Sequence, residues 1–234
     1  MPLLPGSPPV EITLRRSAQT RRFSLRISRL DGRVTLSMPL RARESEALRF
    51  AQQQEGWIRQ TLAEMPGQQQ VGLGDQIPVE GRLCRLMAGQ GRSVRCEGDA
   101  LLVPGDPQQA GTRVGAFLKV LARDRLAAAC DRHAARLGQR YTRLTLRDTR
   151  SRWGSCAHDG ALMFSWRLIM APPPVLDYVA AHEVAHLIEM NHSPAYWAVV
   201  ERVFPGWQVQ RNWLHNHGQA LHGYRFGPVP AAKD

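Results

Sequence analysis

Residues 178–197 read YVAAHEVAHLIEMNHSPAYW, and within them His182, Glu183 and His186 form an H-E-x-x-H sequence. On an α-helix, residues four apart lie on the same face, so His182 and His186 can hold one metal ion. Glu183 would then reach a water molecule bound to that ion. The sequence therefore predicts a helix that carries a metal site and a carboxylate able to act as a base.

The stretch around this motif is apolar on nearly every side. Apolar residues recur through residues 175–188 at positions distributed almost all the way round a helix, which predicts burial of most of its surface. Buried His and Glu side chains without partners cost free energy, which a bound metal would offset. The alternative is that both histidines are core side chains with hydrogen-bond partners and that Glu183 belongs to an ion pair.

A catalytic zinc site usually has three protein ligands and one open position, so a third ligand is needed. His192 follows shortly after His186, beyond a helix end predicted at residues 190–191, where Asn tolerates the left-handed conformation that turns a chain back. This is the spacing of the metzincins, although those proteins carry Gly at the turn position where this chain has Glu189. We expect His192 to be the third ligand. Glu189, as a ligand or as a partner of one, and Glu201 are the alternatives.

The length and charge of the chain bound its organisation. A chain of 234 residues can form one substantial core or a small domain beside a larger one. We predict a β-rich N-terminal domain at residues 1–110 and a metal-binding catalytic domain at residues 111–234. The formal net charge is +11, and basic residues far outnumber acidic ones within residues 113–167. An anionic substrate or a nucleic acid near the site is one interpretation, and a solvated basic surface is the other.

The cysteines and the N-terminus indicate the compartment. The four cysteines, Cys84, Cys96, Cys130 and Cys156, are widely spaced and form no C-x-x-C pair. This favours a reduced, intracellular setting. The start, MPLLPGSPPV, lacks the positively charged lead of a signal peptide, and no apolar run approaches the roughly 20 residues that span a bilayer. We expect a cytoplasmic protein with no membrane partner, and the sequence leaves its oligomeric state open.

The N-terminal half shows strand patterns around one predicted helix. Polar and apolar residues alternate on both sides of Asp31-Gly32, which predicts a hairpin in a small antiparallel sheet. Residues 44–65 have helical spacing, and we expect Trp57 and Ile58 to pack this helix on the sheet. Short apolar runs within residues 77–103 predict further strands. The polar face of the first sheet carries Arg15, Arg16, Arg21, Arg22 and Arg26.

This arginine-rich face has two interpretations. It could bind nucleic acid, or it could be a solvated sheet face. Few aromatic residues are interleaved with the arginines to stack on bases, which favours the solvated face.

The elements before the metal helix predict a substrate edge. Residues 112–137 form a long amphipathic pattern with Gly138 placed to cap it. Residues 144–152 and 162–169 then predict a hairpin that leads through three prolines, residues 172–174, into the metal helix. In zinc peptidases the strand before this helix commonly binds an extended substrate by strand addition.

Several blocks of sequence together resemble the YgjP-like metal-dependent hydrolases, a family related to the SprT-like and WLM zinc peptidases. The blocks are RSRWGSC at residues 150–156, WRLIMAPPPVLDYVAAHEVAHL at residues 166–187 and NHSPAYW at residues 191–197. The resemblance implies a zincin-like α+β catalytic domain following the β-rich part. It also implies that His182, His186 and His192 are zinc ligands and that Glu183 is the general base.

The combined prediction is a zinc-dependent hydrolase, and a metallopeptidase is favoured. Zn²⁺ would polarise the scissile group, and Glu183 would activate the zinc-bound water. Arg150, Arg152 and Trp153, beside the predicted edge strand, are the candidates for substrate binding, and the substrate would be a peptide or an anionic small molecule. One alternative is a nucleotide phosphoanhydride hydrolase in which arginines of residues 140–167 clamp phosphates. The other is a nucleic-acid-associated zinc module, which would normally need a fourth protein ligand.

Overall fold

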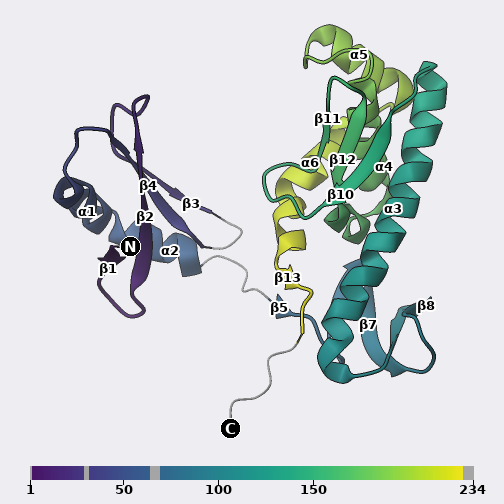
Figure 1. Cartoon of the computed structure of the whole chain (residues 1–234), viewed down its shortest axis with the longest axis horizontal. Helices are drawn as coiled ribbons and strands as arrows, with labels where there is room; N and C mark the ends of the chain where they lie inside the picture. Colours follow the sequence, from purple (N-terminus) through teal and green to yellow (C-terminus); the bar gives the residue numbers. More distant parts are fainter. Residues whose placement is uncertain (1, 29–31, 64–68, 229–234) are drawn as a thin grey trace. The chain divides into compact units, whose positions relative to one another are not determined.

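The computed structural model describes residues 2–28, 32–63 and 69–228, and the chain divides into two compact units, Met1–Gly67 and Gln68–Asp234 (Figure 1). The boundary predicted at residues 110–111 therefore differs from the one in the structure. Strands within residues 76–104 share one hydrophobic core with the long helix that follows them, which assigns them to the second unit. The predicted α+β class is confirmed.

The first unit is a mixed sheet with two helices. Its strands lie in the order β1-β2-β4-β3, with β2 parallel to β4 and β3 antiparallel to β4, so the sheet is not purely antiparallel as predicted. The helix predicted over residues 44–65 is two helices with a break at Gln54. The elements are β1 (Leu3–Leu4), β2 (Val10–Ser17), β3 (Ser24–Ile27), β4 (Val34–Pro39), α1 (Glu44–Gln53) and α2 (Glu55–Ala63).

The predicted hairpin of this unit is present, with Ile27 opposite Val34 in the β3–β4 pair, although Asp31 at its turn lies outside the described residues. Ile58 is fully buried in the core of the unit. Trp57 was expected to pack beside it but is 46% exposed, because it lies one position round the helix on the outer face.

The second unit begins with a four-stranded sheet in the order β6-β7-β9-β8 and a long helix, α3 (Ala110–Leu137). Gly138 ends α3 in the left-handed conformation with φ of 65°, as the sequence predicts, because only a residue without a Cβ adopts this conformation at little cost. The strands are β5 (Gln69–Gln70), β6 (Gln76–Val79), β7 (Arg82–Gly89), β8 (Arg95–Glu97), β9 (Ala100–Pro104) and β13 (Tyr224–Arg225), which pairs with β5.

A three-stranded sheet follows in the order β10-β12-β11, formed by β10 (Arg143–Arg147), β11 (Gly154–Cys156) and β12 (Ala161–Ser165). The sequence predicted a hairpin between β10 and β12, but these two strands are parallel. The loop over residues 148–153 carries the chain across to the other side of β12, so the antiparallel pair is β11–β12. The exposed edge nearest the metal helix is therefore β11, and β12 is the central strand.

The remaining helices are α4 (Pro173–Ala185), α5 (Pro194–Val203) and α6 (Gln208–His217), and most of α4 is buried. Three short 3-10 helices complete the unit: η1 (Pro107–Gln109), η2 (Trp166–Met170) and η3 (Gly218–His222). Among the residues described, no helix combines the length and apolar character needed to cross a membrane.

Candidate metal centre

Helix α4 carries His182 and Glu183 of the H-E-x-x-H sequence in its last turn. Prolines occupy its first turn, where a missing N–H leaves no hydrogen bond unmade. The helix ends at Ala185 with His186 as its C-cap, which is earlier than the end predicted at residues 190–191. The C-terminal end of a helix carries partial negative charge from unpaired carbonyl groups, so it favours a cation beside His182 and His186.

The structure brings three histidines together. Candidate ligand nitrogens of His182, His186 and His192 all lie within 4.8 Å of one another. Nε2 of His182 is 3.2 Å from Nε2 of His192. Two nitrogens bound to one tetrahedral zinc at about 2.0–2.1 Å would lie about 3.3 Å apart, so this separation fits a shared metal ion.

Hydrogen bonds orient one of these rings for coordination. Nδ1 of His186 lies 3.0 Å from the backbone oxygen of Glu189, and a carbonyl oxygen only accepts. We therefore assign the proton of His186 to Nδ1, which leaves the lone pair of Nε2 free for a metal. Nδ1 of His182 is buried and has no hydrogen-bond partner among the residues described. Burial first, and then His186, His192 and Arg211, lower the pKa of His182 to about 3, which keeps it neutral.

The two alternative ligands lie in other interactions. The carboxylate of Glu189 accepts a hydrogen bond from the backbone N–H of Asn191 at 3.3 Å. The carboxylate of Glu201 accepts a hydrogen bond from the backbone N–H of Gly206, also at 3.3 Å. Neither belongs to the cluster of candidate ligands within the described residues. Glu189 therefore contributes its backbone oxygen to the site, as a partner of His186.

Helix α5 supports the three histidines through Tyr196 in its first turn, whose ring centroid also lies 4.8 Å from that of His192. Ser193 caps the helix by accepting a hydrogen bond from the backbone N–H of Tyr196. The Tyr196 ring, fully buried, stacks on His186 with centroids 4.4 Å apart, and its hydroxyl donates to the backbone oxygen of His182 at 2.9 Å. The sequence analysis did not identify this positioning role of Tyr196. The available signal was its place three residues after the Ser193 cap, in the first turn of the helix.

Glu183 is 5% exposed and lies against the edge strand β11. A Cβ on Gly154 would come within 2.5 Å of Oε1 of Glu183, so only glycine leaves room for this carboxylate. Burial raises the pKa of Glu183 to about 8, and the charge of Arg152 opposes the rise. Glu183 forms no ion pair within the described part of the chain. This argues against the alternative interpretation, in which Glu183 belongs to a structural ion pair.

A cavity of about 360 Å³ opens beside His182 and Glu183. Such a volume lies within the range of ligand-binding sites. Two of the three substrate-binding candidates, Arg152 and Trp153, line it, whereas Arg150 lines a smaller adjoining cavity together with Arg152. Arg211 and Leu214 of α6 also line the larger cavity, and sequence reasoning did not identify them.

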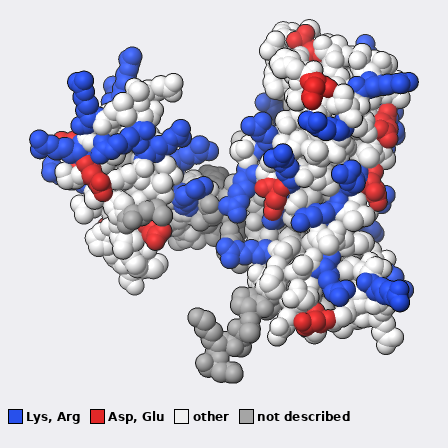
Figure 2. Space-filling model, viewed as in Figure 1, with Lys and Arg blue, Asp and Glu red and all other residues white. Residues whose placement is uncertain are grey.

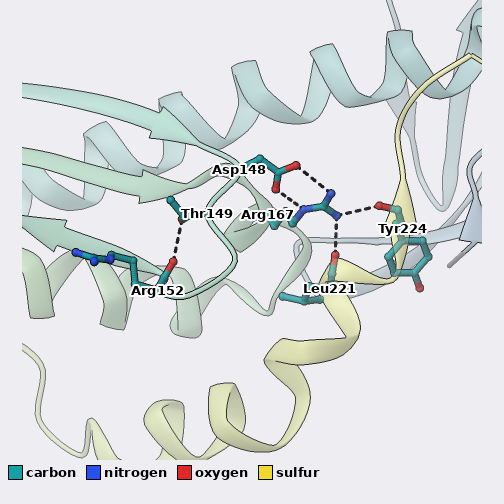
Figure 3. Close-up of polar contacts among 6 residues, drawn as sticks. All are labelled: Asp148, Thr149, Arg152, Arg167, Leu221 and Tyr224. Carbon is teal, nitrogen blue, oxygen red and sulfur yellow. Dashed lines mark hydrogen bonds and ion pairs between the residues drawn. The ribbon is translucent and has the colours of Figure 1, made fainter. Parts of the chain in front are cut away.

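A buried arginine shapes the loop that carries Arg152. Arg167 donates two hydrogen bonds to the carboxylate of Asp148, at 2.6 and 3.2 Å, and two more to the backbone oxygens of Leu221 and Tyr224 (Figure 3). The hydroxyl of Thr149 donates to the backbone oxygen of Arg152 at 2.9 Å. Figure 3 shows the side chain of Arg152 directed away from the Asp148–Arg167 pair. These contacts therefore fix the loop, while the Arg152 side chain lines the cavity.

Comparisons with known proteins identify a family whose model matches this chain. A family model described as YgjP-like, metallopeptidase domain, matches residues 21–217. The chain is also similar to a solved structure, the metallopeptidase zymogen abylysin of Pyrococcus abyssi, at 20% identity and a TM-score of 0.38 over 40% of this chain and 95% of that one. No curated protein matches the sequence. The family match spans most of the chain, including all three histidines and Glu183.

Proposed function

The chain belongs to the YgjP-like metallopeptidase family, and from this premise we propose that it is a zinc-dependent peptidase with Glu183 as its general base. The observation that carries the proposal is the cluster of three histidine nitrogens within 4.8 Å of one another, one of which, His182, lines the same cavity as the buried carboxylate of Glu183. Three protein ligands with one open position are the usual ligand set of catalytic zinc.

In the proposed reaction, His182, His186 and His192 hold the metal. Zinc bound there would act as a Lewis acid on the scissile carbonyl and lower the pKa of a coordinated water. A carboxylate oxygen of Glu183 accepts a proton from the attacking water and passes it to the leaving nitrogen. Gly154 positions Glu183 by leaving space for its side chain, and Tyr196 positions His182 and His186.

Strand β11 is suited to bind an extended peptide. Backbone hydrogen bonds join Ser165 to Trp153 and Ala157 to Ala161 at the two ends of the β11–β12 pair. Since alternate residues of an antiparallel strand face the partner strand, the N–H and C=O groups of Gly154 and Cys156 point away from β12. A substrate strand could pair with these groups directly beside Glu183.

The experiment that tests the proposal compares Glu183→Gln with the wild-type protein, each loaded with zinc. The amide cannot accept the proton but removes no metal ligand. We expect zinc content to be retained and peptide cleavage to fall by roughly 10²–10⁴-fold. His182→Ala serves as the control that loses metal. Preserved cleavage in Glu183→Gln, or metal loss equal to that of His182→Ala, would contradict the role of Glu183.

A phosphoanhydride hydrolase acting on nucleotides is the second candidate, because Arg152 and Arg211 line the cavity. Two other arginines of the predicted clamp are already occupied: Arg143 lies 3.6 Å from Asp159, and Arg167 pairs with Asp148. This weakens the candidate. Release of phosphate or pyrophosphate from nucleoside triphosphates, abolished by Glu183→Gln and without any peptide cleavage, would favour it over the peptidase.

A structural zinc module that binds nucleic acid has less support. Such a site would close with four protein ligands, commonly including Cys, whereas the cluster found among the described residues contains three histidines.

A further inference from the structure

Two arginines line the cavity without acidic partners. Among the described residues, no Asp or Glu pairs with the guanidinium of Arg152 or with that of Arg211. Arg211 is held by aromatic rings instead, with Cζ 5.4 Å from the Trp197 centroid and 5.7 Å from that of Trp207. The two tryptophans stack on each other at 4.1 Å, which gives Arg211 a firm platform.

The surroundings of the cavity are positive and otherwise mostly apolar. Among the described residues, Glu183 is the one acidic residue that lines either the cavity or its smaller neighbour, and the smaller cavity is also lined by Arg150. On α6, the residues at 211, 214 and 215 lie on one helical face and all line the cavity. Lys and Arg also predominate over Asp and Glu on the face of each unit seen in Figure 2. An anionic group on a substrate would therefore be drawn to this cavity.

We propose that the cavity is a carboxylate subsite, in which Arg152 and Arg211 bind an acidic side chain or the free C-terminal carboxylate of a peptide substrate. This inference rests on the proposed peptidase function. Guanidinium groups bind carboxylates through charge-assisted, often bidentate hydrogen bonds. Pairing with the arginines also neutralises the substrate carboxylate, which would otherwise repel Glu183 in the same cavity.

The lining suits one carboxylate better than a polyphosphate. Besides the two arginines, the cavity wall includes Trp153, Tyr178, Val179 and Leu214, and no Lys, Ser or Thr lines it within the part of the chain that the structure describes. Nucleotide sites commonly surround their phosphates with several backbone N–H groups, a lysine and hydroxyl groups. A peptide supplies apolar surface together with a single negative charge, which matches this wall.

The experiment uses the zinc-loaded full chain and internally quenched peptides. One set carries a single Glu at successive positions, with Gln in the matched peptides. A second set carries a free or an amidated C-terminus, which separates the two sources of a carboxylate. We expect kcat/KM to be at least about tenfold higher for the acidic member of one pair.

Variants assign this preference to the two arginines. Arg152→Gln and Arg211→Gln should each lower the ratio of kcat/KM between the paired peptides towards one. Arg211→Glu should favour Lys over Glu at the selected position, which a merely structural role of Arg211 would not produce. Arg202→Gln, exposed on α5 and outside the cavity, is the matched control and should keep the wild-type ratio. The ratio does not depend on the fraction of active enzyme, so partial unfolding does not distort it.

Each outcome has one interpretation. Equal cleavage of acidic and neutral peptides by the wild-type protein would overturn the carboxylate subsite and leave the peptidase in place. No cleavage of any peptide would overturn both. Hydrolysis of nucleoside triphosphates that depends on Arg152 and Arg211, in the absence of peptide selectivity, would reassign the arginines to phosphate.

Discussion

At the scale of single residues, Gly154 is the most specific requirement of the site beyond the histidines and Glu183. A methyl group at this position would meet three atoms of the Glu183 side chain at 2.5–2.8 Å. The carboxylate would have to move, and a displacement of about 1 Å at a reacting group costs about 10²-fold in rate. We predict that Gly154→Ala lowers kcat for peptide cleavage by about 10²-fold and retains zinc.

Gly56→Ala is the control for this prediction. Gly56 lies in α2, and apart from its chain neighbours and the backbone of its own helix, no atom of the described residues comes within 4 Å of a Cβ built on it. This variant should keep the wild-type kcat. Metal analysis and steady-state kinetics on both variants provide the measurement, and unchanged turnover in Gly154→Ala would show that Glu183 does not need its present position.

The residues of the site differ in how far sequence could predict them. His182, Glu183 and His186 follow from helical spacing, and His192 follows from its distance beyond the helix. Arg211 could not be found in this way, because its approach to the cavity depends on how α6 packs beside α4. Gly154 stands in a recognisable block, but its role depends on the contact with a side chain from another element.

At the scale of elements, the edge strand β11 gives a test of peptide binding with a matched pair of prolines. Proline removes a backbone N–H and is tolerated at a sheet edge only where that N–H faces outwards. The alternation along β11 places the N–H of Cys156 outwards and that of Ser155 towards β12.

We therefore predict opposite consequences for the two substitutions. Cys156→Pro should raise KM for peptides several-fold or more and leave the unfolding midpoint close to that of the wild-type protein. Ser155→Pro should lower that midpoint, because it removes a hydrogen bond of the sheet. Urea unfolding and peptide kinetics measure the two effects, and a Cys156→Pro enzyme with unchanged KM would argue against strand addition.

Sequence predicted helices better than strand pairing. The bounds of α3 follow from its apolar stripe and from Gly138, which are local signals. The partner of β12 does not follow from local signals, because the path of residues 148–153 is set by the pairing of buried Arg167 with the half-exposed Asp148, a contact between residues far apart in sequence. The early end of α4 likewise reflects the turn in which Nδ1 of His186 meets the Glu189 carbonyl.

At the scale of the whole molecule, the residues that the structure describes form two hydrophobic cores that share no residue. One contains Ile58, and the other contains Leu118 and the residues around the metal site. The sequence alone placed the boundary later, since strand patterns within residues 77–103 look alike whichever core they join. Their apolar faces pack against α3, and this packing cannot be read from local periodicity.

Two cores predict two unfolding events. Ile58 and Leu118 are both fully buried, and truncating such a side chain costs about 2–5 kcal/mol. In calorimetry of the full chain, Ile58→Ala should lower one transition and Leu118→Ala the other. Bound zinc should raise only the transition lowered by Leu118→Ala, since the ligands belong to that unit. A single transition shifted equally by both variants would contradict two independent cores.

The central claim is that three histidines hold a catalytic zinc ion with one open position. X-ray absorption spectroscopy at the zinc edge, on the zinc-loaded protein, tests it most directly. We predict three imidazole nitrogens at about 2.0–2.1 Å and one further light atom, and the loss of one imidazole in His192→Ala. Two imidazoles with a protein carboxylate, unchanged in His192→Ala, or a sulfur ligand at about 2.3 Å, would contradict the account.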